Sequence, residues 1–138
     1  MEIDSKSIAT AHGEITCLEA GSGEPLVLLH GIGSGAASWQ AQLEAFSDRY
    51  RVIAWDAPGY GGSAPVGRTV PDARDYAGVL AQFLDAMEID SCHLVGHSLG
   101  ALMVCSFARR WPDRVKSLLI GDPAPGYGDA GAEIQAQR

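Results

Sequence analysis

Short apolar runs alternate with helix-length segments along most of this chain, and this alternation limits the possible folds most strongly. The runs PLVLLHG (25–31), RVIAWD (51–56), CHLVG (92–96) and SLLIGD (117–122) have the length of buried strands. In the segment after the first of them, Trp39, Leu43 and Phe46 recur at helical spacing. Such alternation requires crossover connections, so the sequence predicts an α/β fold with a mostly parallel sheet and helices on both faces.

Two helices have clear signals. Between Asp72 and Met87, apolar residues recur three and four positions apart, and Asp72 and Asp75 place carboxylates at the first turn. The segment LGALMVCSFARRW (99–111) is apolar nearly all round and should end before Pro112. We therefore expect the first helix to cover the sheet with one face and the second to be deeply buried.

The sequence also predicts how two of the strands are placed. EITCLEAG (14–21) meets PLVLLHG through SGE, which predicts two neighbouring strands joined by a tight turn. SLLIG (117–121) would form an apolar sheet edge, which natural proteins usually protect. Residues 123–138 show no periodicity, and no linker or repeat divides the chain. We expect residues 1–138 to be part of one domain, truncated after its last strand.

Composition excludes several classes of function. The formal net charge of −7 and the pI of about 4.9 argue against nucleic-acid binding, which requires a basic face. The longest apolar runs fall far short of the ~20 residues that cross a bilayer, and the first residues do not resemble a secretory signal. We expect a cytoplasmic protein with no membrane partner. Cys17, Cys92 and Cys105 lack metal or redox spacing, so we expect buried free thiols and no metal or organic cofactor.

The stretch GHSLG (96–100) lies between a predicted strand and a predicted helix. A serine hydroxyl attacks only when a base takes its proton, and a G-x-S-x-G turn lifts the hydroxyl clear of the sheet. Gly96 and Gly100 allow the tight turn around Ser98, and the N–H of Leu99 would point to a developing oxyanion. The glycine-containing segment LLHGIG (28–33) offers a second donor, the N–H of Ile32.

Three motifs, HGIG (30–33), DAPGYGGS (56–63) and GHSLG (96–100), occur in the order and spacing of a known family. Together they resemble the N-terminal half of the α/β-hydrolase superfamily, in the branch with a serine nucleophile. This resemblance implies that Ser98 is the nucleophile, that Ile32 and Leu99 supply the oxyanion hole, and that residues 56–63 lie beside the pocket. It also implies a small-molecule substrate with an ester-like carbonyl. A serine in place of aspartate argues against the dehalogenase and epoxide-hydrolase branches.

The partners of the serine are missing from the expected places. The superfamily places its acid and then its histidine after the nucleophile, but His12, His30, His93 and His97 all precede Ser98. His30 could approach the site or could simply be a hydrogen-bonded loop histidine. Asp122 follows the last predicted strand and is a candidate acid, although it could instead cap a turn before Pro123.

We therefore expect the base to come from a C-terminal half or a second chain that completes the site. The 138-residue chain alone should be almost inactive.

Two other interpretations stay open. GIGSGA (31–36) matches a dinucleotide-binding fingerprint, with Asp56 about 20 residues further on. That interpretation leaves GHSLG and the PGYGGS segment unexplained. The other is a hydrolase-like fold that only binds its ligand.

Overall fold

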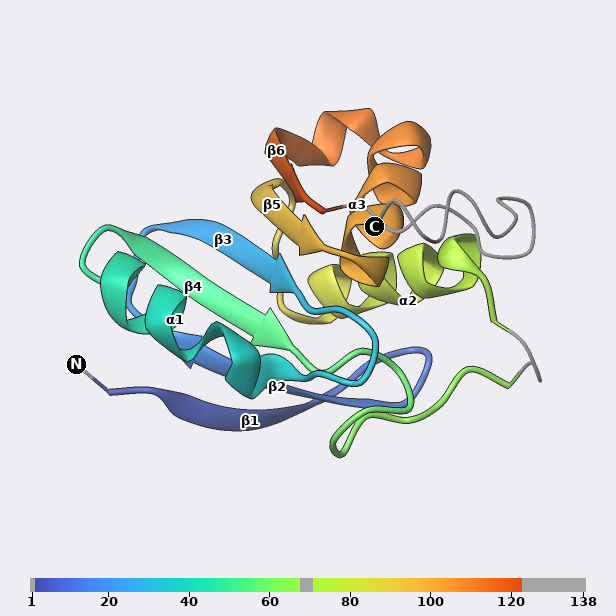
Figure 1. Cartoon of the computed structure of the whole chain (residues 1–138), viewed down its shortest axis with the longest axis horizontal. Coiled ribbons are helices and arrows are strands. Elements are labelled where there is room, and N and C mark those ends of the chain that lie inside the picture. The colour runs from blue at the N-terminus through green and yellow to red at the C-terminus, as the bar shows by residue number, and fades with distance from the viewer. Residues whose placement is uncertain (1, 68–70, 123–138) are drawn as a thin grey trace.

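A six-stranded sheet forms the centre of the computed structural model, which describes residues 2–67 and 71–122 (Figure 1). The strands lie in the order β1-β2-β4-β3-β5-β6. β3 to β6 pair in parallel, and β2 is antiparallel to both of its neighbours, β1 and β4. Their bounds are Asp4–Ala9, Glu14–Ala20, Glu24–Leu29, Tyr50–Trp55, Cys92–His97 and Val115–Gly121 for β1 to β6. The predicted α/β fold with a mostly parallel sheet is confirmed.

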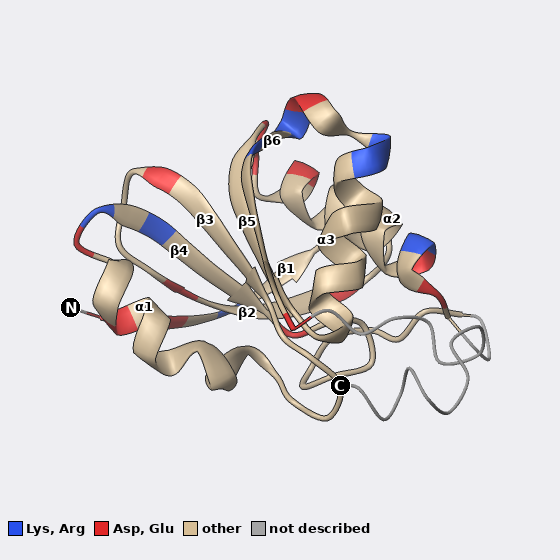
Figure 2. Ribbon diagram, turned by 45° about the horizontal axis from the view of Figure 1, so that its top comes forward, with Lys and Arg blue, Asp and Glu red and all other residues tan. Residues whose placement is uncertain are grey.

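Helices lie on both faces of this sheet, as predicted. The short helix α1 (Gln40–Phe46) follows a 3-10 turn, η1 (Ala36–Trp39), and packs against β4. The longer helices α2 (Ala73–Ala86) and α3 (Leu99–Arg110) pack against each other on the opposite face (Figure 2). Between Arg110 and β6 lies a second 3-10 turn, η2 (Pro112–Arg114).

The start of α2 is fixed by two reciprocal hydrogen bonds. The Asp75 N–H donates to the Asp72 carboxylate at 3.0 Å, and the Asp72 N–H donates to the Asp75 carboxylate at 2.8 Å. This capping box satisfies N–H groups that have no partner within the helix. The carboxylates that the sequence placed at the first turn therefore define where α2 begins.

The predicted pairing of the second and third strands is wrong. β4 lies between them, with β2 antiparallel on one side and β3 parallel on the other. The turn that joins β2 to β3 passes over the start of β4, and a Cβ at Gly21 would lie 2.3 Å from the Tyr50 carbonyl oxygen. β4 follows both strands in the sequence but lies between them in the sheet. A turn motif cannot predict this insertion, because it depends on contacts between distant segments. β1 was not predicted from the sequence, because its segment DSKSIA has few apolar residues.

The burial of α3 differs from the expectation too. One face is buried through Gly100, Ala101, Met103, Val104 and Phe107. Leu99, Leu102 and Cys105 are only half-buried, and of these Leu99 packs against the core. The helix ends at Arg110, before Pro112, as predicted.

The edge expected for the last strand is present in the described part of the chain. β6 pairs only with β5 there, and Leu118, Leu119 and Ile120 are exposed, Leu119 by 65%. The sequence tail without periodicity, residues 123–138, lies outside the described residues.

Most of the core lies between the sheet and the pair α2 and α3, and it holds two of the three thiols. Cys17 and Cys92 are buried, and burial raises the pKa of each thiol to about 11, whereas Cys105 is half-buried. No group of three or more metal-ligating side chains occurs among the residues with described positions. In that same part of the chain, no helix combines the length and apolar character needed to cross a membrane.

Candidate active site

Ser98 stands in the turn between β5 and α3, at the carboxyl edge of the parallel strands, where α/β proteins bind ligands. Its backbone has φ 57° and ψ −118°, a conformation that residues other than glycine rarely adopt. Two hydrogen bonds hold it. The Ser98 N–H donates to the Gly121 carbonyl at 3.1 Å, and the Ala101 N–H donates to the Ser98 carbonyl at 3.0 Å.

Two glycines make this turn sterically possible. A Cβ at Gly96 would lie 2.4 Å from the Gly100 carbonyl oxygen, and one at Gly100 would lie 2.3 Å from the Leu29 carbonyl oxygen. Both distances are far shorter than any real contact, and the obstructing atoms belong to the backbone. The first turn of α3 therefore packs directly on the ends of β3 and β5 only because both positions lack a side chain.

The segment after β3 approaches Ser98 closely. A Cβ at Gly31 would lie 2.9 Å from Ser98 Cβ and 3.4 Å from Ser98 Oγ. Gly31 is therefore packed against the serine side chain, and the peptide bond from Gly31 to Ile32 begins beside it. The glycine motif HGIG and the serine turn therefore meet in the structure through Gly31 and Ser98, which are 67 positions apart in the sequence.

His30 holds this segment in place. Its Nε2 accepts the Ala57 N–H at 3.0 Å, so the ring proton is on Nδ1, which donates to the Gly31 carbonyl oxygen at 2.8 Å. Burial lowers the pKa of His30, so the ring is neutral near pH 7. In a trans peptide the C=O and the next N–H point in opposite directions. The hydrogen bond to the Gly31 carbonyl thus also sets the direction of the Ile32 N–H.

Within the described residues, the N–H groups of Ile32 and Leu99 have no hydrogen-bond acceptor. The Ile32 side chain is 59% exposed, and Leu99 is the first residue of α3, where the helix dipole is positive. Two unpaired donors on segments that flank Ser98 form a local environment that favours negative charge.

The loop of residues 56–63 braces the segment on its far side. Asp56 accepts the Ala36 N–H at 2.9 Å and the Thr16 hydroxyl at 2.6 Å. The Tyr60 ring packs edge-on against His30 with centroids 4.8 Å apart, and its hydroxyl accepts the Gly33 N–H at 3.4 Å. The family resemblance predicts that this loop lies beside the pocket, but the supporting roles of His30, Asp56 and Tyr60 were not predicted. All three residues lie in the motifs HGIG and DAPGYGGS, which are the sequence signal that could have indicated these roles.

No histidine donates to or accepts from Ser98 Oγ within the described part of the chain. Both ring nitrogens of His30 are bonded to the backbone, and His12 contacts the Ala64 carbonyl at 2.8 Å. His93 contacts Ser117 at 2.6 Å, well before the carboxyl ends of the strands. His97 is exposed, and Asp122, also exposed, follows β6 with φ 45°.

The dinucleotide-binding interpretation does not fit this geometry. GIGSGA leads into the four-residue turn η1 and the seven-residue helix α1, rather than opening a long helix at the glycines. Asp56, which would have to bind a ribose, has both carboxylate oxygens engaged by Ala36 and Thr16.

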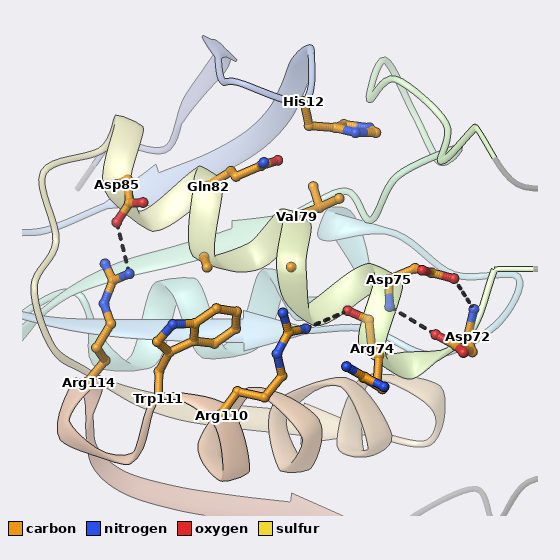
Figure 3. Close-up of a pocket in the computed structure, with 12 residues that line it drawn as sticks. His12, Asp72, Arg74, Asp75, Val79, Gln82, Asp85, Arg110, Trp111 and Arg114 are labelled. Carbon is orange, nitrogen blue, oxygen red and sulfur yellow. Dashed lines mark hydrogen bonds and ion pairs between the residues drawn. The ribbon is translucent and has the colours of Figure 1, made fainter.

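A cavity of about 760 Å³ lies away from Ser98, between α2 and the end of α3 (Figure 3). Another, of about 410 Å³, lies between α1 and the faces of β5 and β6 and does not include Ser98 either. Neither of these two cavities includes Ser98, which is half-buried at the end of the sheet.

Comparison with known proteins gives consistent matches. The sequence profile of the alpha/beta hydrolase fold family matches residues 24–131. The chain is 41% identical over 107 residues to the 2-hydroxy-6-oxononadienedioate/2-hydroxy-6-oxononatrienedioate hydrolase of Burkholderia vietnamiensis, covering 74% of this chain and 37% of the relative. It is 36% identical over 114 residues to the dihydrolipoyllysine-residue acetyltransferase component of the acetoin cleaving system of Cupriavidus necator, covering 81% of this chain and 29% of the relative.

Among solved structures, naproxen esterase from Bacillus subtilis is 33% identical with a TM-score of 0.81, covering 93% of this chain and 47% of the esterase. The chain thus spans about a third of the length of the curated relatives that it matches.

Proposed function

Since the chain belongs to the alpha/beta hydrolase fold family, we propose that it carries the nucleophile of a serine hydrolase that acts on an ester-like carbonyl. The observation that carries the proposal is the strained turn at Ser98, flanked by the unpaired N–H groups of Ile32 and Leu99. A positive φ at a serine costs free energy, and such strain is typical of functional positions.

The chemistry proceeds by acyl transfer in two steps. Ser98 Oγ attacks the carbonyl carbon while its proton passes to a base, and the carbonyl oxygen becomes an oxyanion. The N–H groups of Ile32 and Leu99 donate to that oxyanion, and the leaving group departs with a proton from the protonated base. Water then releases the acyl group from Ser98 by the same sequence of proton transfers.

The base is a histidine supplied from outside residues 1–138, by the remainder of a longer protein or by a second chain. Three points support this: the described histidines do not bond Ser98, the four histidines of the chain precede it, and the chain spans about a third of its relatives. Asp122, directly after β6, is a candidate for the acid that would orient this histidine.

The substrate is a small molecule with an ester, thioester, lactone or vinylogous carbon–carbon bond to cleave. The relatives support this range, since one is named for hydrolysis of a 2-hydroxy-6-oxo dienedioate, one for acetyl transfer and one as a naproxen esterase. The acidic chain is consistent with a cytoplasmic protein that acts on no nucleic acid.

The test is ester hydrolysis by the protein together with the segment or second chain that supplies the histidine, comparing the unmodified sequence with Ser98→Ala and Ser117→Ala. Ser117 is a matched control, because it is a serine that already contacts a histidine, His93 at 2.6 Å, but lies away from the turn after β5. We expect Ser98→Ala to lower kcat by roughly 1,000-fold or more and Ser117→Ala to leave it unchanged. Full activity in Ser98→Ala would refute the proposal. If neither variant nor the unmodified protein hydrolysed any ester, a fold used only for binding would replace it.

A further inference from the structure

Arginine side chains gather at one place far from Ser98, where α2 begins and α3 ends. A cavity of about 300 Å³ is lined by Arg74, Ser106, Arg109 and Arg110. Three of the ten basic residues of a chain with net charge −7 thus line one small cavity. Such a concentration of positive charge on an acidic protein requires a reason.

The helix dipoles account for only part of this clustering of arginines. Arg109 and Arg110 lie in the last turn of α3, where cations are stabilised by the helix dipole. Arg74 lies in the first turn of α2, where the dipole disfavours a cation, and it faces the other two. Asp72 and Asp75 lower the potential at this helix end, but each also accepts a backbone N–H in the capping box.

Although the carboxylates of Asp72, Asp75 and Asp85 line the adjoining cavity, these three arginines form no direct ion pair within the described residues. Arg114 pairs with Asp85 at 2.8 Å, whereas neither Arg74 nor Arg109 forms an ion pair there. Arg110 is held in position, since its Nη1 donates to the Arg74 carbonyl at 3.0 Å and its guanidinium lies 4.3 Å from the Trp111 ring centroid. One guanidinium is therefore pre-positioned, and two others are available to an anion.

The small cavity borders a larger one. The cavity of about 760 Å³ shares Arg74 and Arg110 with it and is also lined by Trp111 and Gln82 (Figure 3). An anionic group among the arginines would thus leave room beside Trp111 for an attached organic group.

We propose that this site binds a small organic phosphate monoester, with the phosphate among Arg74, Arg109 and Arg110 and the organic part beside Trp111. Guanidinium groups match phosphate oxygens with paired hydrogen bonds, and the Ser106 hydroxyl adds a further donor. This binding site is independent of the chemistry proposed for Ser98.

The test is an NMR titration of the protein with phenyl phosphate, with ionic strength kept constant by sodium chloride. The chain has three tryptophans, and a Trp111→Phe variant assigns the Trp111 indole signal. We expect this signal to shift to saturation with a Kd below about 1 mM, while that of Trp55, fully buried in the core, stays in place. Inorganic phosphate should compete at about tenfold lower affinity, because it lacks the organic group.

Two arginine variants complete the test. Arg109→Ala should weaken binding about tenfold, because it removes a charged hydrogen-bond donor. Arg49→Ala is the matched control, an exposed arginine that lines neither cavity, and it should bind like the unmodified protein. A shift that never saturates, equal binding of benzoate and phenyl phosphate, or equal weakening by both variants would overturn the proposal.

Discussion

At the scale of residues, the close contacts of Gly96 and Gly100 beside Ser98 are with backbone atoms, and backbone cannot move aside as a side chain can. Gly100 illustrates this, since its missing Cβ would meet the Leu29 carbonyl oxygen at 2.3 Å. The role of Gly100 is therefore steric and independent of any reaction. It can be tested through stability alone.

We expect Gly100→Ala to lower the free energy of unfolding by at least about 2 kcal/mol, because the first turn of α3 must move away from β3. Gly67→Ala is the control, since a Cβ at that exposed position meets no atom within 4 Å. It should change stability by no more than about 0.5 kcal/mol. Urea denaturation of both variants measures the difference, and equal stabilities would show that the close approach is not real.

Because His30 is buried and neutral, we expect the free energy of unfolding to depend on pH. Burial lowers its pKa in the folded protein below the ordinary value of 6.5, so the unfolded chain binds the proton more tightly. The stabilisation from the neutral ring is complete above about pH 6.5 and is lost as the pH falls through the lowered pKa. The loss approaches about 1.4 kcal/mol per pH unit.

Urea denaturation between pH 7.5 and 4.5 measures this loss. In a His30→Gln variant, whose side-chain oxygen still accepts the Ala57 N–H, this part of the pH dependence should disappear. Identical pH profiles for the two proteins would contradict the assignment of a neutral, buried His30.

At the scale of elements, α2 is held by its capping box at one end and by packing along one face, but its interior contains Gly78. A glycine inside a helix is destabilising by roughly 0.5–1 kcal/mol relative to alanine. A Cβ at Gly78 would meet only Arg110 Nη1, at 3.9 Å, an ordinary contact. The position therefore has room for a methyl group.

Gly78→Ala should accordingly raise the free energy of unfolding by roughly 0.5–1 kcal/mol, as measured by urea denaturation. A loss of stability would mean that α2 and α3 approach each other more closely at this point than the structure indicates.

β6 is the element with the least protection. It lies at the sheet edge of the described part, and Leu119 is 65% exposed. An apolar edge strand with free backbone groups favours pairing with another chain. We expect the 138-residue chain to self-associate through this edge.

A lysine in place of Leu119 should reduce this association, because an edge charge opposes strand pairing and the side chain fills no core position. Sedimentation velocity over a range of concentrations measures the effect. Unchanged association in Leu119→Lys would show that another surface is responsible.

At the scale of the whole molecule, local sequence patterns predicted most elements but not all of their neighbours. The α2 boundaries followed from Asp72 and its apolar spacing, because these signals act within one helix. The insertion of β4 between β2 and β3 could not be predicted in this way, because it depends on contacts between segments far apart in the sequence. The polar strand β1 was missed because pairing with β2, rather than its own pattern, specifies it.

The candidate site was predictable to a similar degree. GHSLG and HGIG pointed to Ser98, Leu99 and Ile32, and the structure brings Gly31 against Ser98. The hydrogen bonds of His30 with Ala57 and Gly31 were not predictable, since they depend on which ring nitrogen faces which backbone group. The roles of Ser98, Ile32 and Leu99 in a reaction remain predictions.

The most direct test of the central claim is covalent labelling by a fluorophosphonate probe, followed by mass mapping of the modified peptide. The labelled protein includes the segment or second chain that supplies the histidine. We predict that the label lies on Ser98, that Ser98→Ala abolishes it and that Ser117→Ala does not affect it. The same treatment of the 138-residue chain should give much slower labelling, because the base is absent. Equal labelling of the unmodified protein and Ser98→Ala, or a label mapped to another serine, would contradict the assignment of Ser98 as the nucleophile.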